Sequence, residues 1–325
     1  MLNNHLVSIE DINLDELEDF FKLVKTLKSS HQARNTSQMK RIEWHLEFGR
    51  SLEMFNLILF FYEASTRTRF SFDAAMQYLG GKVTSSENAS EFTSFVKDET
   101  LEASIKAISS YADAIVIRHP DLGSAEAAAS VSNVPIINAG DGAGEHPTQA
   151  LLDLFTIWEH LQRNDSHQQM VLTFVGDLRA GRTVHSLLRL VDRLMGTDLD
   201  MVSYIIAVSP PELALPVVIS QEEIDIPIIV AKSLSKEIIS ESDVIYMTRT
   251  QKERGSVITN PTSYTLSPEY TNALKSSAII MHPLPQNDEL PEEVDKLTQA
   301  RYYTDQVPNG LYVRMALLLK IFDCT

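Results

Sequence analysis

The sequence predicts an α/β protein built from two doubly wound parallel-sheet domains that are joined by long helices. Short apolar runs, rich in β-branched and aromatic residues, alternate along the chain with helix-like stretches, which is the pattern of parallel strands connected by helices. The runs form two sets, separated by the long segment HPTQALLDLFTIWEHLQRN. They lie at residues 56–63, 114–119 and 134–140, and then at residues 170–178, 204–209, 226–231, 243–249 and 278–285.

Apolar spacing predicts the two long helices. In residues 146–164 the apolar side chains recur at three- and four-residue intervals, so this segment is an amphipathic helix that we expect to join the domains. Its apolar positions are Ala150, Leu151, Leu154, Phe155 and Trp158. Residues 310–322 predict a second amphipathic helix. Because doubly wound folds bind ligands beyond the carboxyl ends of their strands, a cleft between the domains is the expected ligand site.

Composition limits the class of partner. The chain has 325 residues, with 28 Lys and Arg against 44 Asp and Glu, and a formal net charge of −16. This balance provides no broad basic surface, which argues against nucleic-acid binding. We expect neither a signal peptide nor a membrane segment, because a basic region followed by an apolar run is missing and the apolar runs are short. Cys324 is the only cysteine, which excludes disulfides and cysteine-held zinc within the chain and favours a cytoplasmic location.

The turn after the first apolar run combines hydroxyl and guanidinium groups. Residues 65–69 read STRTR, between the predicted strand and a predicted helix over residues 68–80. The N–H groups and dipole of a helix start attract anions, and hydroxyls with a guanidinium can surround a phosphate. The simpler alternative is a helix cap followed by solvated arginines. In that alternative, an arginine in the first turn would oppose the helix dipole with no anion to compensate it. Phosphate binding is therefore the favoured interpretation.

The spacing along this helix also predicts its apolar face. The residues assigned to that face are Phe70, Ala74, Ala75, Tyr78 and Leu79.

Six motifs, in order between residues 61 and 285, resemble those of the aspartate carbamoyltransferase catalytic chains, within the aspartate/ornithine carbamoyltransferase family. They read FYEASTRTRFSF, IRHP, HPTQALLDLFTI, GDLRAGRTVHSL, MTRTQKER and HPLP. The segment RYYTDQVPNGLYVRMALL extends the match to residue 318. Any one motif is a weak signal, whereas six in order are specific.

The resemblance implies both an organisation and an activity. Residues 1–147 would bind carbamoyl phosphate and residues 148–307 aspartate, with a helix at about residues 308–325 packing back on the first domain. The chain would transfer the carbamoyl group of carbamoyl phosphate to the amine of L-aspartate, giving N-carbamoyl-L-aspartate and phosphate, a step of pyrimidine synthesis. The resemblance implies a homotrimer with shared active sites and no cofactor, metal ion or general base. It leaves open whether regulatory chains bind.

Two features favour aspartate over ornithine. The HPLP motif has no cysteine after the histidine. The ornithine enzymes resemble one another in that they carry a cysteine at this position. Arg249 and Gln251 in MTRTQKER suit a dicarboxylate better than a cationic side chain.

The resemblance assigns carbamoyl phosphate to residues of several motifs. The phosphate would be held by Ser65, Thr66, Arg67 and Thr68. The carbonyl oxygen would be bound by Thr68, Arg118 and His146, because donors aimed at developing negative charge promote acyl transfer. Gln149 would bind the carbamoyl nitrogen, and Pro283 and Leu284 would complete the site. Without the family, His146 is an ordinary helix-entry histidine, Gln149 a solvated glutamine and Arg118 an exposed strand-end arginine.

The resemblance assigns aspartate to Arg182, Arg249 and Gln251, with Lys97 reaching in from the neighbouring subunit. Each arginine alone could equally form a surface ion pair. The implied catalytic set is Thr68, Arg118, His146 and Lys97. Other charged residues of these motifs are expected to form structural ion pairs, namely Glu63, Arg69 and Arg254.

The sequence also departs from the family. Asp98 stands where a glycine usually follows the loop lysine, Gln286 stands where arginine is usual, and the loop at residues 255–267 is longer than expected. These departures keep two alternatives open: a transcarbamoylase with another amino-acid acceptor, and a non-catalytic scaffold homologue. A dinucleotide-binding dehydrogenase is disfavoured, because FVGDLRAGRTVHS lacks the G-x-G-x-x-G pattern.

Overall fold

The computed structural model describes residues 5–87, 99–163, 169–216, 224–250 and 261–324. The chain divides into two compact units: unit 1 comprises Met1–Leu152 with Asn309–Thr325, and unit 2 comprises Asp153–Pro308. Each unit contains one sheet in which every strand pair is parallel. The prediction of an α/β protein with two parallel sheets is therefore confirmed.

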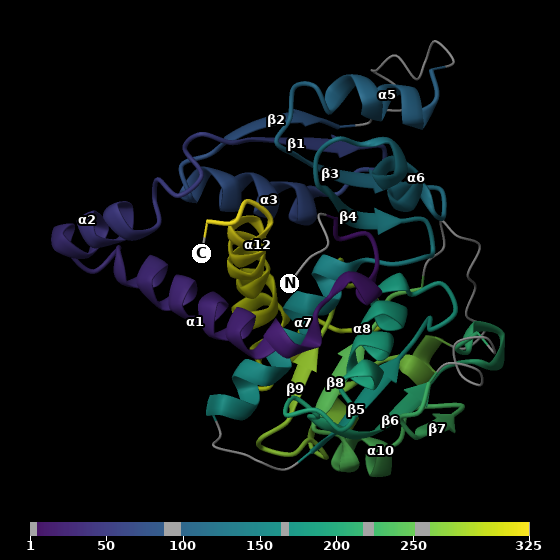
Figure 1. The fold of residues 1–325 in the computed structure, drawn as a ribbon. Helices are drawn as coiled ribbons and strands as arrows, with labels where there is room; N and C mark the ends of the chain where they lie inside the picture. The colour runs from purple at the N-terminus through teal and green to yellow at the C-terminus, as the bar shows by residue number, and fades with distance from the viewer. Residues whose placement is uncertain (1–4, 88–98, 164–168, 217–223, 251–260, 325) are drawn as a thin grey trace. The chain divides into compact units, whose positions relative to one another are not determined.

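Unit 1 is built on a four-stranded sheet in the order β2-β1-β3-β4, which Figure 1 shows from top to bottom. Its strands are β1 (Asn56–Phe61), β2 (Lys82–Ser86), β3 (Ala114–His119) and β4 (Ile136–Asp141). Its helices are α1 (Leu17–Ala33), α2 (Gln38–Glu47), α3 (Thr66–Tyr78), α5 (Leu101–Ile108) and α6 (Ser124–Val131), with the start of α7 (Pro147–Arg163) and most of α12 (Val307–Ile321).

Helices cover both faces of this sheet. Ile58 and Phe60 share one apolar cluster with Ile105 of α5 and with two alanines of α6. The alternate residues of β1 are also buried, and α3 packs on β1 and β2. Strands buried on both faces read as continuous apolar runs, which is why β1, β3 and β4 were predictable.

Unit 2 is built on a five-stranded sheet in the order β7-β6-β5-β8-β9, which Figure 1 shows from right to left. Its strands are β5 (Met170–Val175), β6 (Val202–Val208), β7 (Ile228–Ala231), β8 (Val244–Met247) and β9 (Ile279–Met281). Its helices are the end of α7, then α8 (Arg182–Arg193), α10 (Lys236–Glu241) and the short α11 (Pro268–Thr271). In both sheets the strand order reverses direction beside the first strand, which is the doubly wound arrangement.

The structure differs from the sequence-based expectations at three elements. The edge strand β2 was not predicted, because it pairs only with β1 and its mostly exposed sequence KVTSS lacks an apolar pattern. Helix α2 was not predicted as a helix. The apolar face assigned to α3 is wrong at Phe70, which is 53% exposed, since the buried positions are Phe72, Ala75, Met76 and Leu79.

Both long helices are confirmed as α7 and α12. In the described part of the chain, no helix combines the length and the apolar character needed to cross a membrane.

Candidate active site

In unit 1, the predicted site residues lie along the carboxyl edge of the sheet. Ser65 directly precedes α3, after β1, and His146 directly precedes α7, after β4. Arg118 lies near the end of β3, where it is in register with Phe61 at the end of β1. The sheet order reverses between β1 and β3, so the turn after β1 and Arg118 flank the point where doubly wound folds bind ligands.

Helix α3 begins in a way that favours an anion. Ser65 is its N-cap, but the Ser65 side chain makes no capping hydrogen bond, and the first turn contains no acidic residue. The first N–H groups of a helix have no partner within the helix, and the dipole there is positive. Thr66 and Arg67 are exposed on this turn, whereas Thr68 is buried. The start of α3 therefore presents backbone donors, hydroxyls and a guanidinium together.

Ion pairs hold the arginines beside this turn, as expected for Glu63 and Arg69. The guanidinium of Arg118 lies 3.3 Å from the Glu63 carboxylate, and its Nη1 donates to the Ala139 carbonyl at 3.1 Å. Arg69 pairs with Glu87 at 3.1 Å and donates to the Ser85 hydroxyl at 3.2 Å. Arg118 is thus fixed by β1 and β4 segments on either side of its own strand.

His146 is 3% exposed at the entrance of α7. Its carbonyl accepts the N–H groups of Gln149 and Ala150, at 2.9 and 3.2 Å, so the residue closes the first turn while Pro147 occupies the first helical position. The Nδ1 atom of His146 lies 3.4 Å from the Thr148 hydroxyl, and Gln149 is partly exposed.

Arg314 supports this entrance and was not identified from the sequence. It is 3% exposed on α12, its Nη2 donates to the Thr148 hydroxyl at 3.4 Å, and its guanidinium carbon lies 5.1 Å from the centre of the Phe72 ring of α3. One buried arginine thereby contacts both helices whose starts carry predicted site residues. An arginine inside an apolar helix sequence usually suggests an exposed position, so the pattern gave no signal for this role.

In unit 2, the predicted residues again lie at the carboxyl edge of the sheet. Arg182 is the first residue of α8, after β5, and Arg249 follows β8. The strand order reverses between β5 and β8, so both arginines flank the switch point of this sheet. Arg182 is 5% exposed, at a helix start with no acidic residue in the first turn, and Arg249 is partly exposed.

A close backbone approach fixes the spacing of these two segments. Gly176, with φ of +117°, lies where a Cβ would be 2.3 Å from the Thr248 carbonyl oxygen. Thr248 returns two hydrogen bonds to the Val175 carbonyl, from its N–H at 2.8 Å and from its hydroxyl at 2.9 Å. Only glycine allows β5 and β8 to end this close together.

Pro283 and Leu284 follow β9 in unit 2, the same unit as Arg182 and Arg249. The Leu284 N–H donates to Nδ1 of the buried His282 at 2.8 Å, so Nε2 carries the proton and donates to Glu289 at 3.0 Å. Burial disfavours the Glu289 carboxylate, but hydrogen bonds from His282 and from the Asn287 N–H outweigh burial and lower the pKa of Glu289. This network holds the HPLP loop in shape.

Gln286 donates to Asp295 at 3.2 Å. Asp295 also accepts the Tyr302 hydroxyl. Gln286 therefore contacts a carboxylate through a neutral side chain.

Several predicted positions lie outside the described residues: Lys97, Asp98, Gln251, Arg254 and most of the loop after residue 250. Within the described ranges, no group of three or more His, Cys, Asp or Glu side chains is placed to hold a metal ion.

The fold and the two edges define a class of protein: a two-unit α/β chain that carries arginine at the strand switch point of each sheet, suited to small anionic ligands. The family models agree with this class. "Aspartate/ornithine carbamoyltransferase, carbamoyl-P binding domain" matches residues 4–159, and "Aspartate/ornithine carbamoyltransferase, Asp/Orn binding domain" matches residues 168–321. The chain belongs to the aspartate/ornithine carbamoyltransferase family.

Individual relatives match along nearly the whole chain. The aspartate carbamoyltransferase catalytic subunit of Thermoplasma acidophilum is 42% identical, with 98% of each chain covered. The multifunctional protein pyr-3 of Neurospora crassa is 40% identical over 98% of this chain, which spans only 16% of that protein. The crystal structure of aspartate transcarbamoylase from Trypanosoma cruzi in complex with carbamoyl phosphate and aspartate superposes with a TM-score of 0.82 at 34% identity, covering 98% of this chain and 95% of that one.

Because Gly176 lies so close to Thr248, alanine should destabilise unit 2 more at Gly176 than at Gly196. Gly176→Ala should lower the free energy of unfolding of unit 2 by roughly 3 kcal/mol or more, because a steric clash adds to an unfavourable φ. Gly196→Ala is the matched control in the same unit: its φ is +73° but nothing lies within 4 Å of the added Cβ, so about 1 kcal/mol is expected.

Urea unfolding followed by the fluorescence of Trp158 measures this difference. The chain has two tryptophans, so Trp44→Phe leaves Trp158, which is in unit 2, as the only reporter. Equal destabilisation by both substitutions would show that Thr248 moves aside without cost.

Proposed function

We propose that the chain is an aspartate carbamoyltransferase, which transfers the carbamoyl group of carbamoyl phosphate to the amine of L-aspartate. The products are N-carbamoyl-L-aspartate and phosphate, for de novo pyrimidine synthesis. The observation that carries the proposal is that two sets of polar residues lie at the carboxyl edges of the two sheets. Hydroxyls, Arg67, Arg118 and His146 share the edge in unit 1, and Arg182 and Arg249 share the edge in unit 2. Membership of the family and the activities named for the relatives support the same reaction.

The unit 1 edge provides what carbamoyl phosphate requires. The start of α3 would bind the phosphate through its N–H groups, the Ser65, Thr66 and Thr68 hydroxyls and the Arg67 guanidinium. This arrangement neutralises the leaving group, which departs as a phosphate anion. In a chain of net charge −16, such local cations are required before any anionic substrate can bind.

Donors aimed at the carbonyl oxygen would promote the transfer. The aspartate amine attacks the carbonyl carbon, a C–N bond forms, and the bond from carbon to the phosphate oxygen breaks. Thr68, Arg118 and His146 would stabilise the negative charge on the carbonyl oxygen, and Gln149 would orient the carbamoyl nitrogen. The departing phosphate accepts the amine proton, so the chain needs no general base. Orientation of the two reactants supplies the remaining rate.

The unit 2 edge suits a dicarboxylate. Arg182 and Arg249 would pair with the two carboxylates of aspartate, assisted by Gln251, because a guanidinium matches a carboxylate in a two-point hydrogen bond. Pro283 and Leu284 would face the carbamoyl group through backbone groups of the HPLP loop. Gln286 reduces the positive charge of this loop relative to the family, and it motivates the alternative of another amino-acid acceptor.

Three finer features of the proposal rest on the family. The chain would form a homotrimer in which Lys97 completes the site of a neighbouring subunit, it would act in the cytoplasm, and its lone Cys324 fits a reducing compartment. Binding of regulatory chains stays open.

Phosphate release from carbamoyl phosphate tests the function. The purified chain should release phosphate when aspartate is added and should not respond to ornithine, because Arg182 and Arg249 favour two carboxylates over a cation. Activity with ornithine alone would overturn the acceptor. Tight binding of carbamoyl phosphate without turnover of any amino acid would favour a non-catalytic scaffold.

Two substitutions should separate the substrates. Arg67→Ala should weaken carbamoyl phosphate binding, measured by calorimetry without aspartate, by roughly 10- to 150-fold, since a charge-assisted hydrogen bond contributes about 1.5–3 kcal/mol. Arg249→Ala should leave that binding nearly unchanged and raise the aspartate concentration needed for half-maximal rate. Arg50→Ala is the control, because it removes one exposed charge that is paired with Glu53 outside the site. An equal loss of carbamoyl phosphate binding in both site variants would contradict the assignment.

Mixed trimers test the role of Lys97. Lys97→Ala and Arg67→Ala proteins should each be nearly inactive, yet trimers refolded from a mixture should regain activity, because some sites then combine an intact Arg67 from one chain with an intact Lys97 from another. Specific activity is measured after refolding, with trimer formation checked by light scattering. Mixed trimers as inactive as their parents would place Lys97 outside a shared site.

A further inference from the structure

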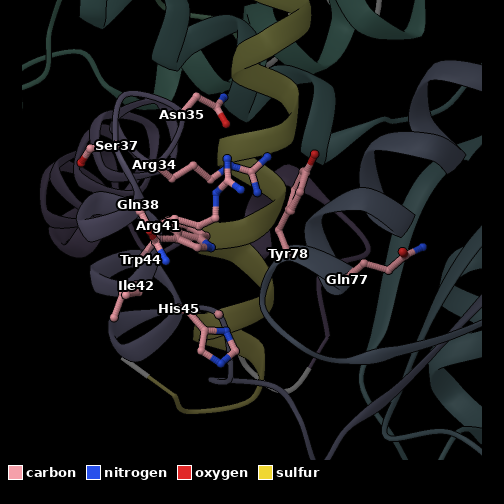
Figure 2. Close-up of a pocket in the computed structure, with 11 residues that line it drawn as sticks. Arg34, Asn35, Ser37, Gln38, Arg41, Ile42, Trp44, His45, Gln77 and Tyr78 are labelled. Atoms are coloured by element: carbon pink, nitrogen blue, oxygen red, sulfur yellow. The ribbon is translucent and has the colours of Figure 1, made fainter.

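A cavity in unit 1 lies apart from the residues assigned to the substrates. It has a volume of about 890 Å³ and is lined by the end of α1, by α2 and by the last residues of α3. Figure 2 shows Arg34, Arg41, Trp44, His45 and Tyr78 around it. The volume lies within the range of sites for small organic molecules, far above what one inorganic ion fills.

The cavity is cationic in an acidic protein. Arg34 and Arg41 line it, and the lining contains no aspartate or glutamate. Among the described residues, neither arginine has a carboxylate partner. Neighbouring cations of the same segment do: Lys40 pairs with Glu43 at 2.7 Å, and Arg50 pairs with Glu53 at 2.6 Å. The two arginines that face the cavity are therefore the ones left without a counter-charge.

The position of Arg41 on α2 adds to this imbalance. Arg41 follows Lys40 at the start of α2, and the first turn of this helix contains no acidic residue. Cations there oppose the helix dipole, so an anion close by would stabilise the arrangement. Arg34 lies at the C-terminal end of α1, where a cation is favourable. Its guanidinium carbon lies over the Tyr78 ring, 4.4 Å from the ring centroid. In Figure 2 both guanidinium groups extend toward the Tyr78 side of the cavity.

The wall behind the arginines is a packed aromatic cluster. His31 contacts Tyr78, Trp44 and Tyr312 with ring centroids 4.4, 5.1 and 5.6 Å apart, which ties α1, α2, α3 and α12 together. Burial, together with the charge of Arg34, lowers the pKa of His31 to about 4. His31 is therefore neutral at pH 7, and the charge of this wall comes from the arginines.

We propose that this cavity binds a phosphorylated organic molecule, with its phosphate group between Arg34 and Arg41. Arg41 near the start of α2 and Arg34 at the end of α1 provide two guanidiniums, which match phosphate oxygens in geometry and charge. The lining also contains four uncharged polar side chains, Asn35, Ser37, Gln38 and Gln77, which can bond hydroxyl or amide groups of the organic body. None of these residues is assigned to carbamoyl phosphate or aspartate, so the proposal is independent of the transfer reaction.

Calorimetry with two probes, ATP without magnesium and fructose 1,6-bisphosphate, tests the site in Arg67→Ala protein, where binding at the start of α3 is weakened. At least one probe should bind at one site per chain, more tightly than inorganic pyrophosphate. The stronger probe identifies the ligand as a nucleotide or a sugar phosphate. Arg34→Gln and Arg41→Gln should each weaken that binding at least about tenfold. Arg50→Gln, the control with a paired arginine, should leave it unchanged.

The indole signals of the two tryptophans give an independent readout. In ¹⁵N-labelled protein the Trp44 signal should shift on titration with the bound probe, while the Trp158 signal, from unit 2, stays in place. A Trp44 signal that keeps its unliganded position in each arginine variant shows that unit 1 is folded. Absence of binding by both probes, or binding unchanged by both arginine substitutions, would overturn the site. Pyrophosphate binding as tight as the better organic probe would overturn the requirement for an organic body.

Discussion

The parallel direction of every strand within each sheet is the constraint on which the candidate site depends. Parallel strands end at the same edge, so segments far apart in sequence deliver their next residues to one place. In unit 1 this brings the turn after β1, Arg118 of β3 and His146 after β4 to one edge, with Arg118 in register with Phe61. In unit 2 it does the same for Arg182 and Arg249. A strand reversed in either sheet would remove its residue from the set.

Arginine at helix starts is the second recurring feature. Arg67 in α3, Arg182 in α8 and Arg41 in α2 each lie in a first turn that contains no acidic residue. A cation at each position opposes the helix dipole, so an anion bound there would be favourable. The chain has 44 acidic and 28 basic residues, so the lack of acidic side chains in these three turns does not follow from composition. The arginine placement is therefore suited to anion binding at all three helix starts.

Much of the fold and of the site followed from the sequence, for identifiable reasons. Strands buried on both faces gave strong apolar runs, and the STRTR turn joined one such run to a helix. Edge strand β2 left no such signal, because its side chains are mostly exposed. The face of α3 was misassigned at Phe70, because apolar spacing fits two overlapping faces and only packing decides between them. Arg314 could not be found, since nothing in an apolar helix sequence distinguishes a buried arginine from an exposed one.

The residues that support the two edges share two helices, α7 and α12. In unit 1, Arg314 of α12 donates to Thr148 at the start of α7. In unit 2, Gln306, directly before α12, donates to the buried Asp153 of α7 at 2.7 Å and accepts the His282 N–H at 2.8 Å, and Asp153 also accepts the Tyr246 hydroxyl at 2.7 Å. These polar contacts fix the His146 entrance, strand β8 and the HPLP loop. Residues of α7, of α12 and directly before α12 that are not assigned to a substrate therefore hold in place residues assigned to both substrates.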